Sequence, residues 1–406
     1  MSNREQLSRS PFRGKENVLT QIFQEFTISQ AKSASNSQKT KDLLVHNYTP
    51  SEKAEMKKAE IKSLEFAVEG SRMVSFLSGL LYKGHANAHG DDNLDSQAWK
   101  FDSNKAIVQA NIYDGDLLMK KGYKNDAYWE YKKADEYFDE QIGKFEKFTY
   151  SDQEKAEVYH EAGSCSRKLA DALNHMGCSK EAMDAYKKAR IYFKEQIGKF
   201  EKFTYSDQEK AEVYHEAGSC SDSISKLLED FPQQALWIPS FKQEAANLFR
   251  MSGEHYYNKV VEIRRETEEL KTTQLINDEA EALEKSAICY TNSAKLDHPH
   301  NREKIAKYGL AGSRYEELAE LFKNSNQPNW TKVSYAYRRG IHCFQSALDN
   351  GPSNLYIWKL AEVWQKNGTV LSNIPGREVD AGDAFEMANR YYQLQVEIGF
   401  NAGADL

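Results

Sequence analysis

The sequence has little proline, little cysteine and no long apolar run. Eight prolines and 28% charged residues in 406 positions favour helices over disorder or a turn-rich β architecture. The five cysteines are odd in number and scattered among helical patterns, so we expect a reducing compartment and no disulfide framework. No stretch approaches the ~18 apolar residues of a membrane span. These absences favour a helical protein that does not span a membrane.

The chain also lacks an excess of positive charge and a signal peptide. Its formal net charge is −7 and its pI is about 5.9, so we do not expect a nucleic-acid partner. The amino terminus, MSNREQLSRSPFRGKENVL, contains no uninterrupted apolar region. The expected location is therefore cytoplasmic, and a signal-independent bacterial secretion route stays open.

Catalytic and metal-binding signatures are missing as well. His160-Glu161 begins like a zinc-protease helix, but Ser164 stands where the second histidine would have to be, and the same pattern returns 55 residues later. No glycine-rich phosphate loop or nucleophile elbow follows a strand-like segment. The sequence thus predicts a protein that is not an enzyme and that has no cofactor and no metal.

One loop keeps an alternative open. Residues 84–95 form a break rich in Gly, Asn and Asp, with two histidines four positions apart and three aspartates nearby. These residues are His85, His89, Asp91, Asp92 and Asp95. A solvated turn is the simpler interpretation, and an enzyme or metal site in this loop is the alternative.

The most prominent feature that is present is a tandem duplication. Residues 140–166 return unchanged at 195–221, and the longer segments 131–166 and 186–221 match at 33 of 36 positions. The three differences are Asp135/Arg190, Glu136/Ile191 and Asp139/Lys194. A unit that is duplicated in tandem usually stacks on its own copy, so a repeat architecture is predicted.

A short signature recurs through the same region: a small residue, three others, an aromatic, two others and a small residue. It occurs at Ala127-Tyr131-Ala134, Ala182-Tyr186-Ala189, Ala245-Phe249-Ser252, Gly340-Phe344-Ala347 and Ala381-Phe385-Ala388, and more weakly at Ser286-Tyr290-Ser293. These positions share one helix face, where small residues let a second helix approach around the ring. Each signature therefore predicts the second helix of a hairpin.

The hairpin before Ala189 is the most complete. Leu169, Ala170 and Leu173 form an apolar stripe on its first helix, and Gly177 can take the left-handed cap that ends it. With the signature that follows, these spacings resemble the tetratricopeptide-repeat (TPR) family over roughly residues 105–398. The signature recurs at 55, 63, 41, 54 and 41 residues, whereas family repeats are ~34 residues. The chain therefore resembles the irregular long-helix relatives, such as the soluble adaptor proteins of vesicle fusion.

The resemblance implies an all-α fold, a right-handed superhelix (α-solenoid) of TPR-like hairpins with an N-terminal helical region. We predict that region, with a flexible start, over 1–95 and the array over 96–406. Ser151 and Ser206 each open a capping box, and so mark the starts of first helices. Pro232 and Pro239 predict a longer loop after the second copy.

The function implied is that of a non-catalytic protein-binding adaptor or scaffold, whose concave surface holds a protein or peptide partner. First helices line the inner face of such an array. The polar candidates are Arg167, Asp171, Asn174 and His175 on one helix and Lys226 on the next. A solvated helix face is the alternative for these residues. A peripheral membrane or vesicle-fusion role, through the apolar residues 73–81, is the alternative function.

Overall fold

In the computed structural model, the described residues are 94–144, 151–200, 202–203, 205–266, 273–298, 301–325 and 327–404, with isolated helical residues between 58 and 72. The α-helices are α3 (Leu94–Lys121), α4 (Lys124–Gly143), α5 (Asp152–His175), α6 (Ser179–Ile197), α7 (Asp207–Leu227), α8 (Ile238–Glu266), α9 (Thr273–Leu296), α10 (Arg302–Lys323), α11 (Trp330–Asn350), α12 (Asn354–Leu371) and α13 (Glu378–Ala404). Every regular element in this part of the chain is helical, which confirms the predicted all-α class.

Several predicted features lie outside the described residues. They are the flexible start, the apolar residues 73–81 and the break at 84–93. Leu94 and Asp95 already belong to α3. The division into 1–95 and 96–406 stays a prediction.

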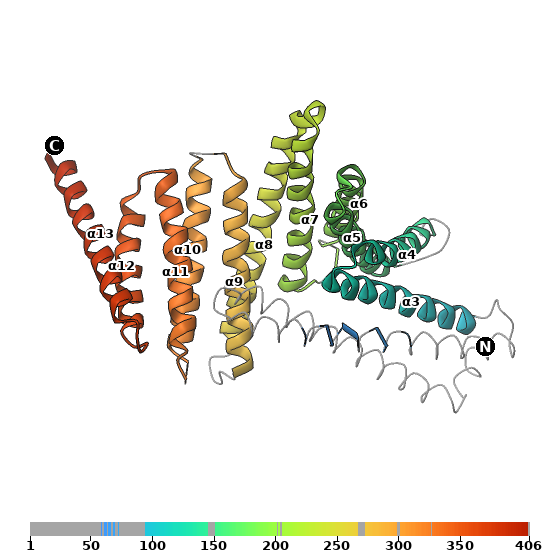
Figure 1. Cartoon of the computed structure of the whole chain (residues 1–406), viewed down its shortest axis with the longest axis horizontal. Helices are drawn as coiled ribbons and strands as arrows, with labels where there is room; N and C mark the ends of the chain where they lie inside the picture. The colour runs from blue at the N-terminus through green and yellow to red at the C-terminus, as the bar shows by residue number, and fades with distance from the viewer. Residues whose placement is uncertain are drawn as a thin grey trace. The chain divides into compact units, whose positions relative to one another are not determined.

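Successive helices pack against one another from α3 to α4 and from α7 through α13, as in a solenoid. The chain divides into two compact units, Met1–Ser151 with Glu161–Ala185 and Asp152–His160 with Tyr186–Leu406. In the second unit, helices α7 to α13 stand side by side in chain order (Figure 1). The handedness of the predicted superhelix stays a prediction.

The recurring signature forms the seams between helices. All of its small residues are buried, and so are all of its aromatic rings except Phe385, which is 37% exposed. Five of these rings, those of Tyr131, Phe249, Tyr290, Phe344 and Phe385, lie against a glycine of the preceding helix. A Cβ added to Gly115 would lie 2.5 Å from the ring of Tyr131, and one added to Gly312 would lie 2.7 Å from the ring of Phe344. The glycine leaves a notch in one helix, and the ring of the next helix fills that notch.

Helix α8 takes part in two such seams. Its Phe249 packs over Gly218 of α7, and its own Gly253 receives Tyr290 of α9. Two serine hydroxyl groups of α9 stabilise the second seam. Ser286 Oγ donates to the Gly253 carbonyl of α8 at 2.7 Å, and Ser293 Oγ donates to the Ala246 carbonyl of α8 at 2.6 Å. The weakest signature in the sequence, Ser286-Tyr290-Ser293, therefore also marks a packed seam between two helices.

The helix ends agree with their sequence signals. Gly177 has φ of 79°, and the Cys178 amide bonds the Leu173 carbonyl at 3.0 Å, which closes α5 with a left-handed residue. Gly122, 55 residues earlier in the sequence, has φ of 90° between α3 and α4. At the start of α7, Ser206 accepts from the Glu209 amide at 3.2 Å, and the Ser206 amide donates back to the Glu209 carboxylate at 2.8 Å. The predicted capping box is confirmed.

The predicted longer connection around Pro232 is present between α7 and α8, and most of it is 3-10 helix. Two short 3-10 helices, η3 (Leu228–Asp230) and η4 (Pro232–Trp237), occupy this segment, and α8 begins directly afterwards at Ile238. Pro232 is the first residue of η4, and Pro239 falls in the first turn of α8. The backbone N–H groups in the first turn of a helix have no acceptor within that helix, so proline, which lacks this N–H, is tolerated there. Both prolines are therefore compatible with the starts of these helices.

Candidate functional site

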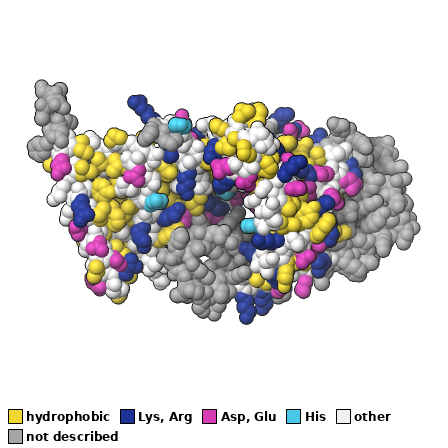
Figure 2. Space-filling model, turned by 45° about the horizontal axis from the view of Figure 1, so that its top comes forward, with side chains coloured by type: hydrophobic (Ala, Val, Ile, Leu, Met, Phe, Trp, Pro, Cys, Tyr) yellow, Lys and Arg dark blue, Asp and Glu magenta, His cyan; other side chains and the backbone are white. Residues whose placement is uncertain are grey.

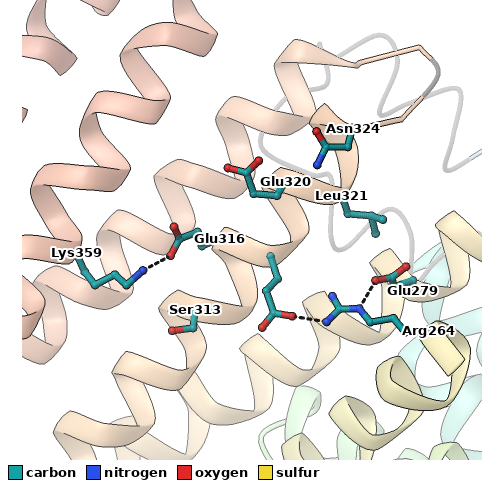
Figure 3. A pocket seen from close by; sticks show the side chains of 9 residues that line it. Arg264, Glu279, Ser313, Glu316, Glu320, Leu321, Asn324 and Lys359 are labelled. Atoms are coloured by element: carbon teal, nitrogen blue, oxygen red, sulfur yellow. Dashed lines mark hydrogen bonds and ion pairs between the residues drawn. The ribbon is translucent and has the colours of Figure 1, made fainter. Parts of the chain in front are cut away.

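A polar cavity of about 470 Å³ lies in the second unit (Figure 3). Four helices supply its lining, and most of it comes from α10. The lining residues are Arg264 of α8, Glu279 of α9, Ser313, Glu316, Glu317, Glu320, Leu321 and Asn324 on or directly after α10, and Lys359 of α12. A cavity of this size is within the range of small-ligand pockets and also suits one or two side chains of a bound peptide.

The α10 wall of the cavity is a row of carboxylates. Glu316, Glu317 and Glu320 lie at helical spacings of one, three and four residues, so they share one side of the helix with Ser313. Like charges this close repel one another on an isolated helix. Cations from α8 and α12 must therefore stabilise the row.

Arg264 provides the cation from α8. Its Nε donates to Glu279 at 2.6 Å and its Nη1 donates to Glu317 at 2.8 Å, so one guanidinium joins α9 to α10. Burial alone would lower the pKa of Arg264, but the hydrogen bonds that it donates to these two carboxylates outweigh burial and raise the pKa above its ordinary value. Figure 3 shows the guanidinium between the two carboxylates at one side of the cavity.

Two lysines of α12 stabilise the opposite end of the row. Lys359 Nζ lies 3.1 Å from Glu316, and Lys366 Nζ lies 2.6 Å from the other oxygen of the same carboxylate. Lys366 also contacts Glu362 at 2.7 Å. Burial alone would lower the pKa of Lys366, and the hydrogen bonds to Glu316 and Glu362 raise it instead. Lys366 thus keeps its charge beside the cavity.

Glu320 completes the row with a different partner. Tyr337 Oη of α11 donates to it at 2.5 Å, and Lys323 Nζ lies 3.2 Å away. Partial burial alone would raise the pKa of this carboxyl, but the hydrogen bonds from Tyr337 and Lys323 outweigh it, and the pKa falls below its ordinary value. The acidic side chains of the α10 row are therefore held in an extended network of ion pairs and hydrogen bonds.

The residues singled out from the sequence lie elsewhere. Arg167 and Asp171 form an ion pair of 3.0 Å within α5, and Asn174 and His175 are exposed at the end of that helix. Lys226 pairs with Asp222 of its own helix at 2.7 Å. The structure thus brings together Arg167 and Asp171, and their role in binding stays a prediction.

Two other sequence features have packing partners. His160 Nδ1 lies 3.1 Å from Gln196 Oε1, and its ring meets Phe193 edge-on at 6.3 Å. Between α6 and α7, Phe200 is buried and its ring lies 5.0 Å from that of Tyr205.

Sequence reasoning missed the cavity, although one signal was available. Ser313, Glu316, Glu317, Glu320 and Asn324 follow the i, i+3, i+4, i+7, i+11 pattern of a single polar stripe. A solvated surface gives the same pattern. Only the position of Arg264 and of the α12 lysines distinguishes a lined cavity from such a surface.

Comparisons with known proteins add little to this picture. No protein-family model matches the chain, and no curated protein matches it. Among solved structures, the Assembly Chaperone of RpL4 (Acl4) matches at 11% identity, covering 73% of this chain and 99% of that chain, with a TM-score of 0.29.

Two further solved structures give similar values. BtubC (BKLC) from P. vanneervenii matches at 13% identity, covering 66% of this chain and 92% of that chain, with a TM-score of 0.18. The apo form of the quorum sensor NprR from B. thuringiensis matches at 14% identity, covering 84% of this chain and 97% of that chain, with a TM-score of 0.18. At these identities and scores, no residue or activity is transferred to this chain.

Proposed function

We propose that this protein is a non-catalytic adaptor that binds a protein segment on the face of α8, α10 and α12. The polar cavity is the observation that carries the proposal. Four of its lining residues are acidic and two are basic, so its local charge favours a segment that brings lysine or arginine. Such a side chain would compete with Arg264 and Lys359 for carboxylates that are already in place.

The charge states in the cavity support binding over catalysis. A general acid at neutral pH needs a carboxyl whose pKa is raised, whereas the pKa of Glu320 is lowered by its hydrogen bonds. Arg264 and Lys366 likewise hold their protons more tightly than usual. These groups suit electrostatic complementarity, which determines partner choice and association rate.

The rest of the surface supports a local site. Figure 2 shows Lys and Arg side chains interspersed with Asp and Glu across its visible coloured part. On this face, the mixture of both signs gives no strong field that would attract any basic molecule. Selectivity would then depend on the arrangement of the carboxylates on α10.

Site-specific photo-crosslinking tests the proposal. A photo-reactive benzoylphenylalanine replaces Ser313 in the cavity, Asn174 on α5, or Glu386 on α13 as an exposed control. After illumination in native lysate, mass spectrometry should identify a partner segment joined at Ser313 and not at Glu386. Crosslinks at Asn174 would support the sequence-predicted residues. Equal labelling at Ser313 and Glu386 would contradict specific binding.

A second candidate function, peripheral membrane contact, is favoured by one observation. Leu236 and Trp237 are 75% and 55% exposed on η4, inside an eleven-residue run, 231–241, that carries no charged side chain. Exposed Trp and Leu without nearby charge can insert at a lipid interface. None of the helices that the structure describes combines the length and the hydropathy that a membrane-spanning helix needs.

Co-sedimentation with phosphatidylcholine vesicles tests this second candidate. If η4 inserts, Leu236→Ala with Trp237→Ala should abolish sedimentation, and Trp129→Ala should leave it unchanged. Trp129 is a matched control because it is also an exposed tryptophan, at 54%. Wild-type protein that stays in the supernatant would exclude the membrane role for η4.

A further inference from the structure

The two copies of the duplicated segment differ at three positions that lie together on a helix. Asp135, Glu136 and Asp139 of α4 correspond to Arg190, Ile191 and Lys194 of α6. The change replaces three acidic residues with two basic residues and one apolar residue. The other 33 of the 36 positions in 131–166 and 186–221 are identical, so α4 from Tyr131 onward and α6 from Tyr186 onward otherwise carry the same side chains.

In the second copy, the new cations meet one acceptor. Arg190 donates to both oxygens of Glu244, from Nε at 2.8 Å and from Nη2 at 2.7 Å, and Lys194 Nζ lies 2.8 Å from the same carboxylate. The Arg190 guanidinium also lies 5.2 Å from the ring centre of Phe241. Glu244 and Phe241 belong to α8, so both altered cations contact the second helix of the following hairpin.

In the first copy, the same position makes a different contact. The Asp135 side chain is buried and accepts a hydrogen bond from Ser166 Oγ of α5. The equivalent serine of the second copy, Ser221, is also buried, but its hydroxyl has no hydrogen-bond partner. Arginine at 190 thus makes a bidentate contact with α8 and leaves a buried hydroxyl unsatisfied.

We infer that this charge reversal is an ordering device, which makes the two nearly identical copies non-interchangeable during stacking. Helix α8 carries Glu244 toward α6, where it meets Arg190 and Lys194. Against the first copy, the same carboxylate would meet Asp135 and Asp139 and be repelled. The identical seam residues would otherwise let α8 stack on either copy, and a stack on the first copy would leave out a whole hairpin. Repulsion against the wrong surface specifies one order.

Charge exchange tests the device. A first variant gives the second copy the residues of the first: Arg190→Asp, Ile191→Glu and Lys194→Asp. Its melting temperature should fall by several degrees, and adding Glu244→Arg should restore most of the loss. General damage to α6 would not be rescued in this way, so failure of the rescue would overturn the inference.

A second variant gives the first copy the residues of the second: Asp135→Arg, Glu136→Ile and Asp139→Lys. Two surfaces then attract Glu244. After refolding from urea, size-exclusion chromatography should show additional species that the wild type does not form. A single species that elutes and melts like the refolded wild type would also overturn the inference, since the charges would then not order the copies.

Discussion

The ion pair between Lys307 and Asp297 provides the sharpest test of how the helices are held together. Lys307 Nζ of α10 lies 2.7 Å from Asp297 Oδ2, just after the end of α9, and the two side chains are only 5% and 0% exposed. Asp297 Oδ1 has no hydrogen-bond partner. A buried pair that is incompletely hydrogen-bonded keeps much of its desolvation cost, so it should contribute little net stability and yet be costly to break.

The expected magnitude follows from that burial. Lys307→Met leaves a buried carboxylate without a cation, which should lower the free energy of unfolding by about 3–5 kcal/mol. Each kcal/mol corresponds to ~2–4 °C in melting temperature for a unit of this size. The double variant Lys307→Met with Asp297→Leu removes both charges, and it should recover wild-type stability or exceed it by ~1–4 kcal/mol.

Urea denaturation followed by far-ultraviolet circular dichroism measures these differences in the wild type, both single variants and the double variant. The control is Arg390→Met, which breaks an exposed pair of 2.5 Å with Glu386, in which the side chains are 65% and 62% exposed. That change should cost no more than ~0.5 kcal/mol. If Lys307→Met cost as little as Arg390→Met, water would have to reach the buried pair, and the reasoning would be refuted.

Three further predictions concern glycine, pH and capping. Gly312→Ala places a Cβ 2.7 Å from Phe344 and should destabilise by ~1–3 kcal/mol, whereas Gly382→Ala meets no atom within 4 Å and should stabilise by ~0.5–1 kcal/mol in thermal melts. Burial raises the pKa of Glu284 from 4.5 to about 7. The Glu284 carboxyl therefore stays protonated to a higher pH in the folded state than in the unfolded chain. As pH rises from 5 to 8, the free energy of unfolding of the wild type should fall by about 3 kcal/mol relative to that of Glu284→Gln. Parallel profiles of stability against pH for the two proteins would contradict this. Ser206→Ala should cost ~1 kcal/mol, and no loss in urea titration would mean that the capping box is dispensable.

Local features of this fold could be predicted from the sequence because their causes are local. Ala182, Tyr186 and Ala189 are buried together because they share one helix face, and that depends only on spacing. The left-handed Gly177 and the Ser206 cap likewise depend on a few neighbouring residues. Repetition strengthened these signals, since the same pattern occurred several times along the chain.

The cavity could not be predicted because its residues meet across long separations. Arg264 and Glu317 are 53 positions apart, and Lys366 and Glu316 are 50 apart. Irregular repeat lengths give no rule for which turn of α10 faces which turn of α8 or α12. For the same reason, the sequence could not show that Arg190, which differs between the copies, pairs with Glu244, 54 positions away.

Helix α8 packs against both α7 and α9, and this limits where repeats can be added to the chain or lost from it. Upstream, the segment 131–166, which joins the later part of α4 to the first part of α5, recurs almost unchanged 55 residues on at 186–221, so a further copy of that repeat could be inserted there. At α8 the same operation would fail, because this helix fills the notch at Gly218 and also presents the notch at Gly253. A chain that ended at Glu266 would expose the Gly253 notch and free the carbonyl of Ala246 from Ser293. We therefore expect helices α7, α8 and α9 to be gained or lost together in evolution and to unfold as one cooperative unit.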